Sequence, residues 1–475
     1  MKFIKYIIIA VTGVGLFSCD TDEFLNPIPT TAVTSNSYFQ TDADVLSGIV
    51  GIYDAIQGVN ESTQSSDGAY NRGVQYEYLL TEHRSDNTRS ATLEGSRADF
   101  HRYLTDADNT QSEDYWASMY DIIFRANNIL TFIDIADASN QASYTAEAKF
   151  LRAYAYFNLV RLYGAVPLIT EVALPSDTEV LYTRVDVATV YAQIVADLQE
   201  AVGALDNSHK ARASQAAAQA LLAKVYLSQP TPNYQDAQVL CEAIINGGDY
   251  SLMTNFNDVF YSELNNEVIW AIQYASGDPL ESQGFSAEFT SAVRQGLQDG
   301  LNMPNTNLIN DLNAYGGNRT ATSITNVQGS IEVAKFLPDG NDWTNDYGGN
   351  ARNSGNDWIV IRYADVLLMH VEAILGTSGS TSSAGALSSF NAIRSRAGLT
   401  AATAISKDDL LLERRVEFAF ENHRFFDLLR FGVADAVLSA HAADMGYSDY
   451  SARALLLPIP AREINQSGGL LTQNP

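Results

Sequence analysis

Residues 147–169, EAKFLRAYAYFNLVRLYGAVPLI, decide the fold of this chain. Alanine, aromatic and aliphatic residues fill most positions from Ala148 to Tyr163, so a helix made of them can turn at most one narrow face toward water. Gly164 and Pro167 come next, and they end the helix because glycine favours a helix C-terminus and proline cannot continue one. We therefore predict a deeply buried helix that ends near Tyr163.

Two further segments repeat the pattern of this helix, SQAAAQALLAKVYLS at residues 214–228 and RYADVLLMHVEAIL at residues 362–375. The matched positions are Ala155/Ala218/Ala364, Leu159/Leu222/Leu368, Arg161/Lys224/His370 and Leu162/Val225/Val371. Each of these two segments is followed by a second one with small and large apolar residues at helical spacing, namely Ala237, Cys241 and Ile244, and Ala386, Phe390 and Ile393. This spacing is typical of tetratricopeptide repeats, in which a small residue lets two antiparallel helices touch. The chain is therefore predicted to be mostly α.

The size and charge of the chain limit what it can be. Its 475 residues exceed the roughly 250–300 at which a single hydrophobic core stops growing, so we expect two lobes or an extended repeat array. The formal net charge is −27 and no basic stripe is present, so the chain repels phosphate backbones. We expect no nucleic acid partner.

The N-terminus, MKFIKYIIIAVTGVGLFSC, has two lysines and then an apolar run that is too short to span a bilayer. Residues 1–18 are predicted to be a signal peptide, and Leu16, Ser18 and Cys19 resemble the lipobox of bacterial lipoproteins. The resemblance implies that Cys19 becomes the first residue and carries lipid, which is then the contact with the membrane. The alternative is an ordinary secretory signal with a chance cysteine. With Cys19 lipidated, Cys241 has no partner for an intrachain disulfide and is predicted to be a buried thiol.

Residues 19–37 are predicted to be an extended acidic tether, because three acidic residues precede Pro27 and Pro29. A helix is expected at residues 42–57. This opening resembles that of SusD/RagB lipoproteins, in the Asp-x-x-x-Asn-Pro-x-Pro pattern that ends at Pro29, in Phe39 and in the Gly-Ile-Tyr that ends at Tyr53. The resemblance implies that the acidic residues after Cys19 direct the protein to the outer leaflet of the outer membrane.

The rest of the chain divides into an N-terminal half, residues 38–265, and a C-terminal half, residues 266–475. Residues 58–113 are polar and rich in glycine, and they are predicted to form loops. A helix is expected from Tyr115, and a short strand in NEVIWAIQYA from Asn266. Residues 276–357 show only weak helix signals, around 286–298 and 306–313. A long segment with so little regular structure is usually functional, so we predict that it holds a binding loop.

The last quarter of the chain also resembles the SusD/RagB family, through four blocks in the family's order and spacing. They are NDWIVIRYADVLLMHVEAIL, ALSSFNAIRSRAGL, LLERRVEFAFENHRFFDLLRF and LLLPIPAREINQSGGLLTQNP. The chain departs from the family at Gly317-Asn318-Arg319, at His370 and in lacking a terminal Gly-Tyr. The resemblance implies a superhelical, tetratricopeptide-type scaffold with large irregular loop insertions and a few short strands.

The same quarter contains a helix start and a charged face. Ser406 and Asp409 form a predicted capping box. Phe418, Phe425 and Leu429 are predicted to share one helical face, while Glu413, Glu417, Glu421 and Arg424 alternate in sign on another.

No catalytic constellation is found in the sequence. The six histidines are scattered, and there is no HExxH, no Gly-x-Ser-x-Gly and no phosphate loop, so we predict no catalytic residues, no metal site and no cofactor. Acidic pairs are too abundant in so acidic a chain to indicate a glycosidase. His370, beside Glu372 on a repeat helix, is predicted to be a packing residue.

Binding a sugar requires flat aromatic faces for the C–H groups of the ring, and amide, carboxylate and guanidinium groups for its hydroxyls. Trp116, Trp270 and Trp358 lie in predicted helices or strands and are expected in the core, whereas Trp343 lies in a polar loop. The candidate ligand-binding residues are Asp342, Trp343, Asn345 and Tyr347 in the second long loop, and Tyr70, Asn71, Arg72, Arg84, Asp86 and Asn87 in the first. For Trp343 the alternative is a residue that anchors its loop.

The resemblance to the SusD/RagB family implies a function. It implies a cell-surface, lipid-anchored protein of the outer membrane that binds oligosaccharide and delivers it to a SusC-like TonB-dependent transporter, as the lid of that barrel. Some relatives are associated with peptides, so a peptide ligand is the first alternative. A surface glycosidase or protease and a pure protein-binding scaffold are the others.

Overall fold

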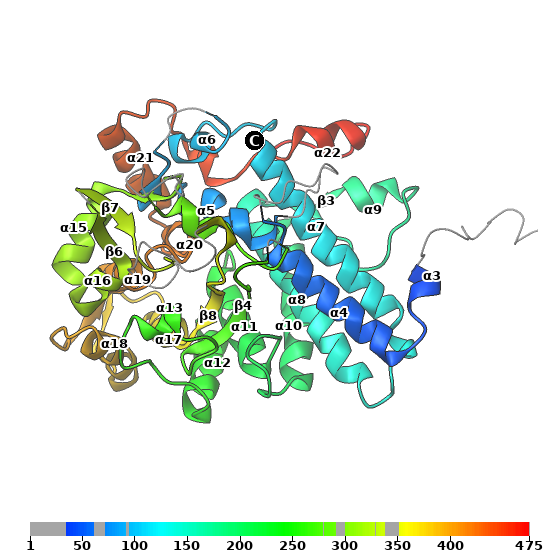
Figure 1. Ribbon diagram of the computed structural model, residues 1–475, viewed down its shortest axis with the longest axis horizontal. Coiled ribbons are helices and arrows are strands. Elements are labelled where there is room, and N and C mark those ends of the chain that lie inside the picture. Colours follow the sequence, from blue (N-terminus) through cyan, green and yellow to red (C-terminus); the bar gives the residue numbers. More distant parts are fainter. Residues whose placement is uncertain are drawn as a thin grey trace, which may run out of the picture.

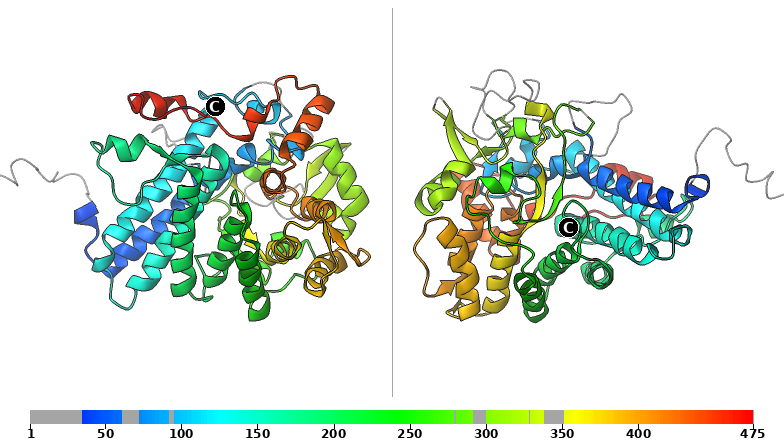
Figure 2. Two further views of the ribbon diagram at one scale, coloured as in Figure 1. Left: turned by 180° about the vertical axis from the view of Figure 1, so that it is seen from behind. Right: turned by 60° about the horizontal axis from the view of Figure 1, so that its bottom comes forward.

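Eight long helices form a continuous stack in the computed structural model of the chain (Figure 1), which describes residues 35–60, 72–91, 95–278, 280–290, 300–327, 329–337 and 351–474. In chain order they are α4 (Asp42–Gln57), α7 (Thr110–Thr131), α8 (Gln141–Tyr163), α10 (Val187–Ala204), α11 (Gln215–Ser228), α12 (Tyr234–Gly247), α17 (Tyr363–Leu375) and α18 (Ala384–Arg396). Each packs against the next in this order. Figure 2 shows the stack from behind. The predicted mostly α, tetratricopeptide-type fold is confirmed.

Helix α8 is buried along nearly its whole length, as predicted. Every residue from Ala146 to Tyr163 is buried except Lys149 and Arg161, and Gly164 ends the helix with a φ of 74°. The apolar matched positions on α8, α11 and α17 are buried as well; Leu159 and Leu368 are each 0% exposed, and Leu222 is 3% exposed. The repeat therefore has the register that the sequence predicts.

Ser, Thr or Asp side chains cap the starts of several helices. Thr41 and Asp44 form a capping box on α4, and Ser406 and Asp409 form the predicted one on α19 (Lys407–Glu417). Asp186 and Ser214 accept hydrogen bonds from the backbone of α10 and α11. Each cap satisfies a backbone N–H group that has no partner within its helix.

The remaining described helices are short. They are α3 (Ser35–Tyr38), α5 (Glu77–Leu80), α6 (Ala98–Arg102), α9 (Thr178–Tyr182), α13 (Asp258–Tyr261), α14 (Phe285–Glu288), α15 (Thr306–Tyr315), α16 (Thr320–Ser323), α20 (Arg424–Arg430), α21 (Ala434–Met445) and α22 (Ala461–Gln466). The 3₁₀ turns are η2 (Gly73–Tyr76), η3 (Ile133–Ile135), η4 (Gly317–Arg319), η5 (Ala351–Asn353) and η6 (Ala452–Leu455). Residues 58–113 thus hold more helix than the predicted loops, and α15 confirms the weak signal at 306–313.

The described strands pair two by two, and all five pairs are antiparallel. The pairs are β1 (Thr88–Arg89) with β5 (Met303–Pro304), β2 (Val166–Pro167) with β3 (Arg184–Val185), β4 (Val268–Ile272) with β8 (Trp358–Arg362), β6 (Ile324–Val327) with β7 (Ser330–Val333), and β9 (Ser380–Thr381) with β10 (Ile405–Ser406). Strand β4 confirms the predicted strand.

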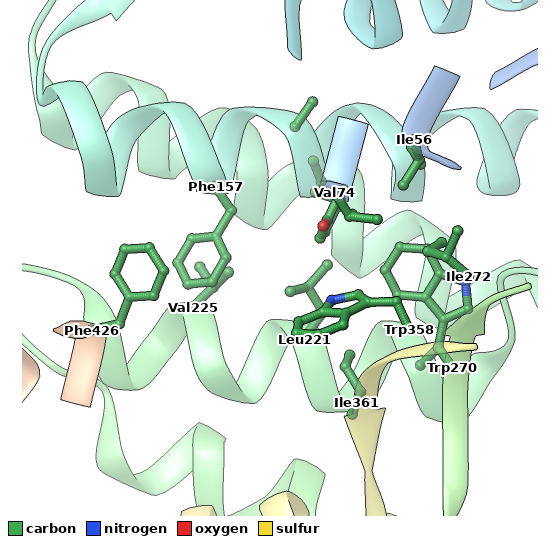
Figure 3. Close-up of a cluster of buried hydrophobic side chains, with 14 of the residues drawn as sticks. Ile56, Val74, Phe157, Leu221, Val225, Trp270, Ile272, Trp358, Ile361 and Phe426 are labelled. Atoms are coloured by element: carbon green, nitrogen blue, oxygen red, sulfur yellow. The ribbon is translucent and has the colours of Figure 1, made fainter. Parts of the chain in front are cut away.

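The β4–β8 pair lies against α11, at the centre of the core. Figure 3 shows Trp270 and Trp358 from the two strands with Leu221 from α11 and Ile56 from α4. Phe150 and Tyr154 of α8 meet the Trp270 ring edge-on, at centroid distances of 4.8 and 5.1 Å. The predicted core role of the tryptophans on regular elements is confirmed, with Trp116, Trp270 and Trp358 no more than 5% exposed.

The prediction that Phe418, Phe425 and Leu429 share one helical face is wrong, because two helices divide this segment. Helix α19 ends at Glu417 and α20 begins at Arg424, because Phe420 and Asn422 adopt positive φ values of 71° and 62°. Glu413, Glu417 and Glu421 are at most 5% exposed. Periodicity in charge cannot separate a solvated face from a buried ionic one, since both place charges at helical spacing.

The buried acids pair with basic residues from distant parts of the chain. Arg362 lies 2.8 Å from Glu267, 2.5 Å from Glu417 and 2.7 Å from Glu421. Arg319 joins Glu413 and Glu417 at 2.7 and 2.8 Å, and Lys335 joins Glu421 at 2.6 Å. Arg396 completes the cluster through Glu267 and Glu417. This buried charge cluster ties α18, α19 and β8 together.

Residues 472–474 return to the N-terminal half. The Asn474 side chain donates to the backbone oxygens of Tyr163, at the end of α8, and Leu457, at 3.0 and 2.7 Å. Arg184 donates to the oxygens of Thr472 and Gln473 at 3.0 and 3.3 Å. The two sequence halves therefore form one packed body.

Candidate ligand-binding face

The described residues include only part of the predicted site. Tyr70, Asn71, Asp342, Trp343, Asn345 and Tyr347 lie outside them, as does Cys19. Arg72, Arg84, Asp86 and Asn87 are described. The frame that borders the predicted loops is therefore the part of the site whose geometry is known.

The described borders of the two predicted loops lie side by side. Asn60, which precedes the predicted ligand residues Tyr70 and Asn71, donates to the Ser282 hydroxyl at 3.1 Å and to the backbone oxygen of Arg352, which follows the predicted Trp343 and Tyr347. Gly284 donates its backbone N–H to Gln75, at 3.2 Å. Residues more than 200 positions apart thus form one shared frame, which we call the loop base.

Gly58 brings the two ends of the first loop into direct contact. Its φ of 73° and ψ of 165° belong to a region essentially reserved for glycine. A Cβ at this position would lie 2.3 Å from the carbonyl oxygen of Arg72. Gln75 strengthens the closure by donating to the oxygen of Gly58 at 3.0 Å. Gly58 and Arg72, on either side of residues 61–71, are therefore held in direct contact.

Tyr76 is the aromatic centre of the loop base. The guanidinium carbons of Arg72 and Arg97 both lie 5.5 Å from the centre of its ring, and Arg97 also forms an ion pair with Glu288 at 3.5 Å. Cations beside an aromatic face are attracted by its quadrupole, so the two arginines hold the ring in place. A cavity of about 10 Å³ beside Tyr76, bordered by Asn60 and Glu288, has room for about one water molecule.

A layer of packed aromatic rings lies beside the loop base. Phe336 stacks on Trp358 at 5.3 Å and on Phe289 at 5.2 Å, and Phe285 meets both Trp358 and Tyr274 edge-on. All five residues are at most 6% exposed. Packed rings resist movement, so the loop base lies against a rigid aromatic layer.

Asp86 and Asn87 already use their polar atoms within the protein. Asp86 pairs with Arg424 at 2.8 Å and with Arg415 at 3.0 Å, and although burial opposes it, the two arginines hold the pKa of its carboxyl well below the usual range. Asn87 is 0% exposed, accepts from Arg415 at 2.9 Å and donates to Glu82 at 3.1 Å. Their contact with a ligand stays a prediction. Their observed contacts join this segment to the C-terminal half.

Arg84 and Arg72 occupy different surroundings. Arg72 is half-buried at the loop base, where it donates to the Val59 oxygen at 3.2 Å. Arg84 lines a separate cavity beside α6 and η6. Sequence reasoning missed Tyr76, Arg97 and Glu288, because they lie in short turns or helices where no periodic pattern marks them.

Other features bear on catalysis and membrane contact. Within the described ranges, no three His, Cys, Asp or Glu side chains gather as metal ligands, and no helix there is long and apolar enough to cross a bilayer. Cys241 is fully buried, and burial raises the pKa of its thiol. His370 is 6% exposed and hydrogen-bonds Ser389 at 2.9 Å, which confirms its predicted packing role.

Two family models match the chain. One, described as the SusD family, matches residues 302–475. The other, described as starch-binding associating with outer membrane, matches residues 35–227. The chain belongs to the SusD/RagB family. The matches fall in both halves of the chain and together include every long helix of the stack except α12.

SusD-like relatives match nearly the whole chain. SusD-like protein P2 of Formosa agariphila is 26% identical over 524 residues, and the match covers 99% of each chain. A solved structure of a laminarin binding SusD-like protein matches with a TM-score of 0.75 at 27% identity, over 92% of this chain and 99% of that one. Surface glycan-binding protein A from Bacteroides thetaiotaomicron in complex with laminarihexaose has a TM-score of 0.75 at 21% identity over 91% of this chain and 99% of its own. That last likeness shows the shared SusD fold alone.

Proposed function

We propose that this SusD-like protein binds oligosaccharide on the surface of the outer membrane and delivers it to a SusC-like TonB-dependent transporter, for which it acts as the lid. It performs no reaction of its own. Cys19 carries the lipid that anchors it, and the loops above the loop base contact the sugar, with Trp343 and Tyr347 as the stacking pair.

The observation that carries this proposal is the loop base itself. Two sequence segments rich in polar and aromatic residues border the same frame, and packed aromatic rings hold that frame rigid. A binding site benefits from a rigid support of this kind, because side chains that are already held in place lose little entropy when a ligand binds. Glycan is the proposed class because relatives that align over most of the chain include a laminarin binding protein.

The test is a calorimetric titration of the purified protein with laminarin oligosaccharides and with a panel of other neutral oligosaccharides. We expect Trp343→Ala to weaken binding by about tenfold to a hundredfold, since a stacking ring at a hot spot contributes roughly 1–3 kcal/mol. Trp343→Phe keeps a ring and should retain most of the affinity. The unfolding midpoint should hardly change.

The opposite pattern would contradict the proposed site. Unchanged affinity with a large fall in the unfolding midpoint would make Trp343 a loop anchor. Binding of peptides but of no glycan would favour a peptide-uptake lipoprotein. New reducing ends, released when the protein is incubated with a polysaccharide, would show a glycosidase instead.

A further inference from the structure

A cavity of about 230 Å³ lies beside α6 and η6 and shares no lining residue with the cavity at Tyr76. These helices lie near α21 and α22, at the upper end of the molecule in Figure 1. Phe100, Leu457 and Pro458 provide apolar surface, and the polar lining residues are Arg84, Tyr103, Thr105, Ser451, Arg453, Gln473 and Asn474. No aspartate or glutamate is among its described lining residues. We call it the arginine pocket.

Arg84 is a buried cation that has no counter-ion among the described residues. It is 2% exposed, and no carboxylate in the described part of the chain lies within ion-pair distance of it. Its guanidinium group donates to the backbone oxygens of Leu80 at 3.2 Å and Ala454 at 2.8 Å, and its carbon lies 4.2 Å from the centre of the Phe425 ring. Burial lowers the pKa of Arg84 to about 9. A guanidinium has five N–H donors, so donors remain for an anion.

Tyr103 adds a second unsatisfied group. It is 9% exposed, and its hydroxyl is buried without a hydrogen-bond partner among the described residues. Its backbone is left-handed, with a φ of 61°, an uncommon conformation for a tyrosine. A buried hydroxyl left unpaired costs free energy, and a ligand that accepts its hydrogen bond recovers that cost.

Arg453 brings a second positive charge to the same pocket. Its side chain is exposed and forms no ion pair or hydrogen bond with any described residue. Asp86, two positions from Arg84 in the sequence, pairs with Arg415 and Arg424, and Asp435 accepts a hydrogen bond from Tyr450 at 3.0 Å. In a chain with a net charge of −27, this is a local positive site.

We propose that the arginine pocket binds the carboxylate of an acidic sugar residue, a hexuronate. Arg84 and Arg453 hold the carboxylate, Tyr103 donates to one of its oxygens, and Phe100 and Leu457 cover C–H groups of the ring. The cavity has room for one sugar residue rather than for a longer chain. The choice of a sugar rests on the proposed glycan-binding function, and the choice of an anion rests on the pocket alone.

The experiment is a titration of the purified protein with galacturonate and glucuronate, each beside its methyl ester, which keeps the sugar ring and removes the charge. We expect at least one uronate to bind about tenfold or more tightly than its ester, with an affinity that falls as salt is added. Acetate and inorganic sulfate are titrated as anions without a sugar. Both should bind more weakly than the uronate.

Three variants locate the binding. Arg453→Gln and Tyr103→Phe are each expected to weaken uronate binding by about tenfold, and neither removes a partner that the fold uses. Arg125→Gln removes the same charge from α7, outside the pocket, and should leave uronate binding unchanged.

Several outcomes would overturn this inference. They are equal binding of ester and acid, unchanged binding in both pocket variants, or a loss in Arg125→Gln as large as in Arg453→Gln. If acetate or sulfate binds as tightly as uronate, the pocket binds anions without recognising the sugar ring, and the proposal of a uronate site is wrong. Neutral oligosaccharide binding that depends on Trp343, without uronate binding, overturns this inference and leaves the proposed function intact. Uronate binding that is lost in the pocket variants, without any binding of neutral glycan, would support this inference and contradict the proposed site at Trp343.

Discussion

At the scale of single residues, Glu417 shows how the SusD-like interior handles charge. It is 0% exposed and lies against Arg319, Arg362 and Arg396. Burial alone would raise its pKa, but the three arginines hold the pKa of Glu417 well below the usual range. Such a group is tolerated inside a protein only while its partners remain, because each partner left alone is an uncompensated buried charge.

We predict that Glu417→Gln lowers the free energy of unfolding by about 3–5 kcal/mol, the range for breaking a buried ion pair. Urea denaturation measures the loss. Glu179→Gln, on the exposed side of α9, is the matched control and should change stability by less than about 0.5 kcal/mol. A loss under about 1 kcal/mol at Glu417 would mean that water reaches the cluster.

Glu82 predicts a dependence of stability on pH. It is 0% exposed, and burial raises its pKa to about 7, against the hydrogen bonds that it accepts from Asn87 and the backbone of Asn422. A pKa raised in the folded state contributes stability that is present at low pH and is lost as the pH rises through about 7.

Glu82→Gln should therefore remove part of the pH dependence. Between pH 5 and pH 8 the wild-type protein should lose roughly 2–3 kcal/mol more stability than the variant. Urea denaturation of both proteins at each pH gives this difference, in which other titrating groups cancel. Parallel stability curves for the two proteins would show that Glu82 ionises normally.

Residue roles were predictable from sequence where they depend on near neighbours. Ser406 and Asp409 are three positions apart, so their capping box is legible in the sequence. Glu417 and Arg362 are 55 positions apart, and nothing local to either indicates their pairing. For the same reason the buried position of Asp86 was not predicted, since its partner Arg424 lies 338 positions away in the sequence.

At the scale of elements, the repeat helices were the most predictable part of the chain. Helix α8 is apolar over several turns, and only a helix buried on nearly all sides suits such a sequence. Helices α5 and α6, with four and five residues, are too short for periodicity to mark, so the segment around them was expected to be loop. The loop base was missed because it is made of such short pieces.

We predict that Leu159→Ala and Leu368→Ala each destabilise the fold by roughly 2–5 kcal/mol. Both side chains are fully buried at the same repeat position, on α8 and α17, so each substitution leaves a cavity between packed helices. Thermal or urea unfolding measures the loss, and Leu174→Ala, at an exposed site, is the control. A change of less than about 1 kcal/mol at either repeat position would show that the neighbouring helices close the cavity.

At the scale of the whole molecule, the two sequence halves share one packed body. Lys224 of α11 pairs with Asp365 of α17 at 2.6 Å, and Arg415 of α19 reaches Asp86 at 3.0 Å. The resemblance in the first and last quarters of the sequence was enough to predict the helical scaffold and its family, whereas two lobes or an extended array were expected in place of one packed body. The ligand was not predictable, because the helical repeats that carry the resemblance contain no ligand-specific pattern.

We predict that Cys19→Ala releases the protein from the membrane. Each buried methylene of a lipid contributes about 0.8 kcal/mol, and two or more chains give stable attachment. Membrane fractionation of cells that lack the transporter gives the readout, and surface labelling reports the side that the protein faces. A variant that still sediments with the outer membrane would refute the lipobox interpretation.

The contact of residues 472–474 with the end of α8 makes the stability of that helix end depend on the last residues of the chain. The oxygen of Tyr163 receives its hydrogen bond from Asn474, so about three hundred residues must be synthesised after α8 before that end of the helix is closed. In a copy that lacks residues 472–474, the oxygens of Tyr163 and Leu457 lose the hydrogen bonds from Asn474. The C-terminal end of α8 is then expected to fray, because carbonyl groups without partners destabilise a helix end.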